Sequence, residues 1–88
     1  MSAAVEVLAL EAVNRDSLKA TAVLRVGAFV LYGVKLIEQF PGSYYLALPQ
    51  APQRRGGSGW RATVDVTNPR LLDAMRDAAV AAWRGATS

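Results

Sequence analysis

The chain has 88 residues, ten Lys and Arg against seven Asp and Glu, and a hydrophobic content of 52%. This composition excludes an intrinsically disordered chain, in which hydrophobic content is low and net charge is high. The length predicts one small domain over residues 1–88, near the size at which a single core is just sufficient and pairing with a second copy is common.

Cysteine and histidine are both absent. The chain therefore has no disulfide framework and no thiol nucleophile, and it lacks the commonest general base and metal ligand. The first residues do not have the basic start of a secretory signal, and no apolar run approaches the roughly 18 to 20 residues of a membrane span. We expect a cytoplasmic protein without a membrane partner.

The first half of the chain predicts three strands. Residues 5–13 are rich in aliphatic side chains and indicate a strand, although a short helix also fits their imperfect alternation. A polar turn at 14–17 leads into 18–26, where small or apolar residues alternate with polar ones. A tight hairpin at Gly27-Ala28 then connects to a β-branched and aromatic strand at 29–40.

Two more strands and a helix follow. Pro41 and Gly42 interrupt the third strand, and a fourth is predicted at 44–49. Tyr44 and Tyr45 are adjacent, so they point to opposite faces of that strand. Residues 60–67 alternate as in a half-buried fifth strand.

The tail changes to a helical period over 69–84. Asn68 suits the N-cap, Pro69 the first helical position, and Gly85 a stop after the last turn. Short connections predict an α+β fold, in which a five-stranded antiparallel meander precedes one amphipathic helix. A single helix leaves part of such a sheet uncovered, so we expect a homodimer.

The order of these elements and several strings resemble the stage V sporulation protein G (SpoVG) or septation protein family. The resemblance runs from about Val5 to Arg84. Its main pieces are VEVLALEAVN, LKATAVLRV followed by FVLYGVKLIE, GSYYLALP, and Trp60-Arg61 where the family has Phe-Arg. It implies a small α+β homodimer that binds DNA, and in some members RNA, as a bacterial regulator linked to septation or sporulation.

In this family, basic residues after a Met-Pro pair and around the C-terminal helix are associated with nucleic-acid contact. Pro49 matches that proline, and Arg54 and Arg55 are the basic residues that follow it. Two departures are plain. The arginines come three residues later than in familiar members, and GGSG replaces an acidic segment before Trp60. The resemblance therefore predicts the fold more directly than the target sequence.

The charge distribution points to the same segment. Arg54, Arg55 and Arg61 carry the whole excess of three positive charges. Guanidinium groups bind phosphate well, and the neighbouring glycines allow the backbone to follow a curved strand closely. Nucleic-acid contact is one interpretation, and a solvated hairpin tip is the other. Trp60 fits packing in a core or dimer interface better than base stacking.

Further basic residues lie on the predicted helix and strands. Arg70 and Arg76 are candidate nucleic-acid contacts, but Asp73 and Asp77 interleave with them at spacings that allow intrahelical ion pairs. The strands also carry basic residues that extend the surface if their faces coincide: Lys19, Arg25 and Lys35.

Enzymatic chemistry is not expected. The carboxylates are scattered along the chain, and no histidine is available to activate a serine. We predict no catalytic residue, no cofactor, no metal and no small-molecule substrate. The main alternative to nucleic-acid binding is a protein-interaction module in which the basic segment docks an acidic partner. A third is a chain that keeps the fold and has lost the activity.

Overall fold

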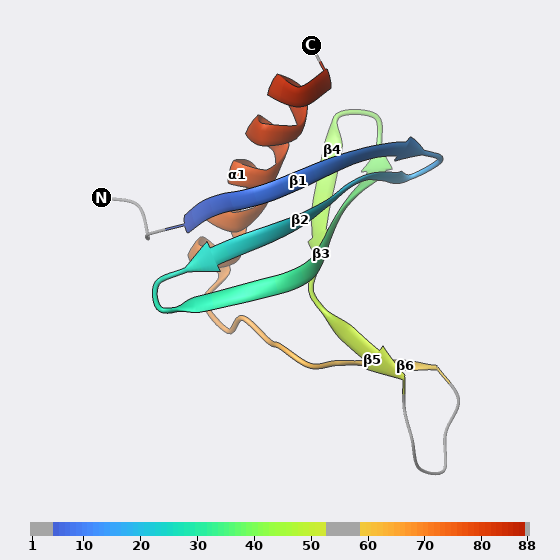
Figure 1. Ribbon diagram of the computed structural model, residues 1–88. Helices are drawn as coiled ribbons and strands as arrows, with labels where there is room; N and C mark the ends of the chain where they lie inside the picture. Colours follow the sequence, from blue (N-terminus) through green and yellow to red (C-terminus); the bar gives the residue numbers. More distant parts are fainter. Residues whose placement is uncertain (1–4, 53–58, 88) are drawn as a thin grey trace.

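The structure, a computed structural model, describes residues 5–52 and 59–87. Four strands form one antiparallel sheet in the order β1-β2-β3-β4, two short strands form a separate antiparallel ribbon, and a helix follows (Figure 1). The elements are β1 (Val5–Arg15), β2 (Leu18–Val26), β3 (Phe29–Phe40), β4 (Ser43–Ala47), β5 (Gln50–Pro52), β6 (Trp60–Ala62) and α1 (Pro69–Thr87). The predicted α+β class, with an antiparallel sheet and one C-terminal helix, is confirmed.

Glycines at two hairpin turns have the backbone geometry that the sequence predicts. Val26 pairs with Phe29, so Gly27-Ala28 is a two-residue turn, and Gly27 has a φ of 59°. Between β3 and β4, Gly42 has a φ of 80° directly after Pro41, as in a type II turn. Both positions require a positive φ, which favours glycine over any residue with a Cβ.

The core lies between one face of the main sheet and one face of α1. Small side chains on β2 allow the helix to approach the sheet closely, and larger ones on β3 and β4 fill the remaining space. Trp83 packs against Tyr44 at 5.6 Å between ring centroids, and its indole N–H donates a hydrogen bond to Asn14 at 2.9 Å. The buried core residues are Ala20, Ala22, Leu24, Val34, Leu36, Leu46, Met75 and Ala79.

The helix starts where the sequence predicts. The side-chain oxygen of Asn68 accepts hydrogen bonds from the backbone N–H groups of Arg70 at 3.0 Å and Leu71 at 3.4 Å, which is an N-cap. The predicted end was wrong, because α1 continues through Gly85 to Thr87. Gly85 does not adopt the positive φ of a C-terminal stop, so the helical turn continues over it.

The predicted fifth strand of the meander was also wrong. The main sheet has four strands, and of residues 60–67 only Trp60–Ala62 form a strand, which pairs with β5. Proline has no backbone N–H to donate, so the chain leaves the sheet at Pro49. Residues 63–68 keep the predicted alternation, with Val64 and Val66 half-buried, as they return to the helix.

We expect Leu24→Ala to lower the free energy of unfolding by about 2–5 kcal/mol, because Leu24 is fully buried and its truncation leaves a cavity against the helix. Leu8→Ala is the matched control, since Leu8 is 46% exposed, and it should cost less than about 1 kcal/mol. Urea unfolding followed by circular dichroism measures both. Equal losses would contradict this assignment of the core.

Candidate nucleic-acid interface

The β5–β6 ribbon carries the basic segment singled out in the sequence. Pro52 on β5 pairs with Trp60 on β6, and Ala51 pairs with Arg61, so the backbone of Arg61 lies within the ribbon. Arg54 and Arg55 belong to the connection between the two strands and lie outside the described residues. Of the three arginines, the structure therefore describes only the backbone position of Arg61, on the ribbon.

This ribbon stands apart from the rest of the molecule. Within the described residues β5 and β6 contact each other and no other strand or helix, and Figure 1 shows them projecting from the main sheet on the side away from the C-terminal end of α1. Its base is held by Thr63. The backbone N–H of Thr63 donates to the carbonyl of Pro49 at 3.1 Å, and its hydroxyl donates to the same carbonyl at 3.0 Å.

The two candidate arginines of α1 differ in their surroundings. Arg76 forms ion pairs with Asp73 at 3.5 Å and Asp77 at 3.1 Å, so the expected intrahelical pairing is confirmed for this residue. Arg70 is exposed in the first turn and forms no ion pair within the part of the chain that the structure describes. Of these two arginines, Arg70 is therefore the one whose charge is more available to bind an anion.

The basic residues of the strands also differ. Lys19 forms an ion pair with Glu38 at 3.4 Å, and Arg25 forms one with Glu6. Lys35 is exposed, and among the described residues it has no ion-pair partner. Two of the three cations are therefore balanced by described carboxylates, and Lys35 is the one whose charge none of them balances.

Lys35 lies on the face of the main sheet opposite α1. Because Val34 and Leu36 are buried in the core beneath the helix, their neighbour Lys35 points the other way. Thr21 and Ala47 pair with Lys35 on the flanking strands, and Ile37 pairs with Tyr45. We call this surface the open face. Its central side chains are Thr21, Val23, Tyr32, Lys35, Ile37, Tyr45 and Ala47.

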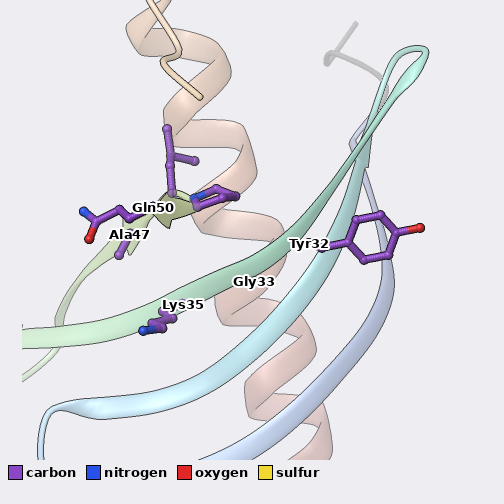
Figure 2. A pocket seen from close by; sticks show the side chains of 7 residues that line it. Tyr32, Gly33, Lys35, Ala47 and Gln50 are labelled. Atoms are coloured by element: carbon purple, nitrogen blue, oxygen red, sulfur yellow. The ribbon is translucent and has the colours of Figure 1, made fainter. Parts of the chain in front are cut away.

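A bulge shapes the open face. The pairing of β2 with β3 shifts between Ala22 and Leu24, so that Val23 lies opposite both Tyr32 and Gly33, and Gly33 has a φ of 76°. A β-bulge bends the strand and re-aims its side chains. A hollow of about 460 Å³ lies beside it, lined by Tyr32, Gly33, Lys35, Ala47, Leu48, Pro49 and Gln50 (Figure 2).

Tyr32 and Gln50 were not among the residues that the sequence marked as functional. A glycine inside an otherwise β-branched and aromatic strand is a signal for a bulge, and Gly33 is such a glycine. A bulge at this position places Tyr32 on the same face as Lys35. The prediction for Tyr44 and Tyr45 is confirmed, because Tyr44 packs under the helix and Tyr45 is exposed on the open face.

The described residues contain no group of three or more His, Cys, Asp or Glu side chains arranged to hold a metal ion. Nor does α1, the helix in the described ranges, have the length and apolar character needed to cross a membrane. Comparisons of the chain with known protein families, with curated proteins and with solved structures give no match. The arrangement of elements and charges described above is therefore what indicates a function for the chain.

Proposed function

We propose that the chain is a SpoVG-like regulatory protein that binds DNA or RNA in the cytoplasm, as a homodimer, and has a role in septation or sporulation control. The observation that carries the proposal is the separate β5–β6 ribbon. It separates the backbone of Arg61 from the main sheet and helix, and Arg54 and Arg55 lie between its two strands in the sequence. These three residues are the whole positive excess of the chain.

A two-stranded ribbon suits a nucleic-acid surface. The major groove of duplex DNA is about 12 Å wide and admits either a helix or a two-stranded β-ribbon. Arginine binds phosphate through a planar fork of N–H donors, and release of condensed counterions drives the association. Arg70 at the exposed start of α1 is a further contact in this proposal, whereas the two carboxylates beside Arg76 reduce its contribution.

The extent of exposed surface supports the homodimer. The chain exposes 6214 Å², whereas a compact monomer of its mass of 9.4 kDa exposes about 5,000 Å². Part of the excess belongs to the projecting ribbon. Large apolar side chains are exposed as well, and a stable dimer covers about 800 Å² of surface, polar and apolar together, on each partner. We therefore assign the exposed apolar surface to contact with a second copy of the chain.

Phe29 marks the surface that we assign to this contact. It is 73% exposed at the tip of the β2–β3 hairpin. Phe29 also lines an apolar groove, whose other apolar walls are Val26, Leu31, Val64, Val66, Leu71 and Met75. Because this side chain and the groove are neighbours, a twofold axis can seat the Phe29 of each copy in the groove of the other.

Salt dependence tests the ribbon. A homodimer contacting phosphates through six arginines should bind duplex DNA with a log–log salt slope of about −5, so affinity falls about 1,000-fold between 50 and 200 mM salt. Arg54→Ala/Arg55→Ala leaves two such arginines and a slope of about −2. Fluorescence anisotropy of a labelled duplex and a labelled single strand, titrated at both salt concentrations, measures the change.

Arg15→Ala/Arg84→Ala is the control, because it removes the same charge from the exposed end of β1 and the last turn of α1. It should leave the slope close to that of the wild type. Equal flattening by both double variants would show that net charge matters and the ribbon does not. If the wild type binds neither probe at 50 mM salt, the nucleic-acid proposal is wrong, and acidic protein partners become the better candidates.

The dimer contact has its own test. Phe29→Asp should convert a species of twice the chain mass into one of 9.4 kDa, because a charge in an apolar interface is left without a partner. Phe40→Asp is the control, since Phe40 is 65% exposed at the opposite end of β3. Light scattering after size-exclusion chromatography reports the masses. A wild type that is monomeric at about 100 µM would refute the dimer.

A further inference from the structure

The open face presents two aromatic rings and one cation without a described ion-pair partner. Tyr32 is 70% exposed and Tyr45 is 43% exposed. Lys35 lies between them in sequence and on the same face. Proteins that bind unpaired strands combine aromatic side chains, on which bases stack, with cations that follow the phosphates. The open face carries both kinds of group.

The spacing of the tyrosines suits a chain of nucleotides better than a single base. Tyr45 pairs with Ile37, which is five residues beyond Tyr32 on β3. At ~3.3 Å per residue the two rings are roughly 16 Å apart along the strand. One base cannot contact both, so each tyrosine would stack on a different nucleotide. Lys35 is then placed to meet the backbone between them.

A nucleotide chain in this arrangement would follow a path along the open face from Tyr32 past Lys35 to Tyr45. The glycine at the bulge leaves room for it. Gly33 has no side chain, and a Cβ placed there would have no neighbour within 4 Å. Figure 2 shows Tyr32, Gly33 and Lys35 in that order along β3, with Ala47 and Gln50 near Lys35 and the ring of Tyr32 pointing away from them. A planar group lying on the face between Tyr32 and Lys35 therefore meets no side chain from β3 at this position.

The path also leads to the ribbon. Gln50 lines the hollow beside Lys35 and is the first residue of β5, where it pairs with Ala62 next to Arg61. At the other end, Asp65 joins Lys35 and Tyr45 in lining a second hollow of about 490 Å³. A carboxylate repels phosphate but accepts hydrogen bonds from base amino groups, so a bound strand would present a base toward Asp65.

We propose that the open face binds single-stranded nucleic acid, with bases stacked on Tyr32 and Tyr45 and a phosphate at Lys35, and that the strand continues toward Gln50 at the start of the ribbon. This inference rests on the proposed nucleic-acid function and specifies its substrate as an unpaired strand. In a duplex the flat faces of the bases are covered by their neighbours, so the tyrosines gain nothing from it.

A second copy of the chain fits this face less well. Charged residues are depleted at the centre of protein interfaces, and Lys35 lies between the two exposed tyrosines in the middle of the open face. The groove beside Phe29 is lined mostly by apolar residues, and Asp65 is the charged residue in that lining. The open face is therefore better suited to an anionic partner that carries aromatic rings.

Four variants of the full-length protein test the proposal by fluorescence anisotropy with labelled dT12, labelled rU12 and a labelled 12-base-pair duplex. Tyr32→Leu/Tyr45→Leu removes both rings and keeps apolar bulk, and it should weaken single-strand binding about 25-fold or more, since each stacked base contributes at least about 5-fold. Tyr32→Phe/Tyr45→Phe keeps the rings and should remain within about 2-fold. Duplex binding should remain within about 2-fold in both variants.

The third variant is Lys35→Gln. Its log–log salt slope for dT12 should be smaller in magnitude by about 0.7, which is the contribution of one phosphate contact on a single strand. Asp65→Asn serves as the matched change of opposite sign, and it should strengthen dT12 binding because it removes an acid that lines the hollow beside Lys35 and Tyr45. Circular dichroism and urea unfolding confirm that each variant folds.

The outcomes separate the two proposals. If dT12, rU12 and the duplex bind through Arg54 and Arg55 while the Leu pair changes nothing, the open-face proposal is wrong and the ribbon proposal stands. If the wild type binds no probe at low salt, both are wrong. If the Leu pair weakens duplex and single strand equally, or converts a dimer into a monomer, the open face is not a stacking surface and its tyrosines serve the fold or the contact between copies.

Discussion

The packing of α1 against one face of the main sheet is the interaction on which the rest of the structure depends. Met75 and Ala79 on the helix join Ala20, Ala22 and Leu24 on β2 in a core that contains no buried polar side chain among the described residues. The area removed from water there provides most of the stability available to a chain of this size. Trp83 extends the contact by packing against Tyr44 with its ring tilted and by donating a hydrogen bond to Asn14.

A single helix covers a single face, and the two other features of the molecule follow from that limit. The opposite face of the sheet remains exposed, so strand alternation presents Tyr32, Lys35 and Tyr45 to solvent. The chain also departs from the sheet at Pro49, because proline cannot continue the ladder, and Arg61 lies in the backbone of the separate ribbon that follows. The open face and the ribbon meet at Gln50, where a single bound strand could contact both.

Much of the fold could be predicted because its signals are local. Gly27 and Gly42 have the positive φ that their turns require, and Asn68 caps the helix as its position implies. The candidate site was predicted less completely. The charge count placed the basic segment on one stretch of chain, and this stays a prediction. Tyr32 was not marked, because one additional residue in a strand reverses which face the following side chains occupy. The bulge at Gly33 has this effect, and its pairing partner Val23 is ten residues away.

The sequence by itself determined the elements and where the charge lies along the chain, since alternation, turn residues and helix caps act between residues that are close in sequence. The tertiary structure alone decided what those elements pair with. Residues 60–67 have the alternation of a sheet strand, yet only Trp60–Ala62 form one, and its partner is β5 rather than the main sheet. Side-chain alternation records which way residues point. Which backbone supplies the hydrogen bonds depends on where distant segments lie in space, and a linear pattern does not contain that information.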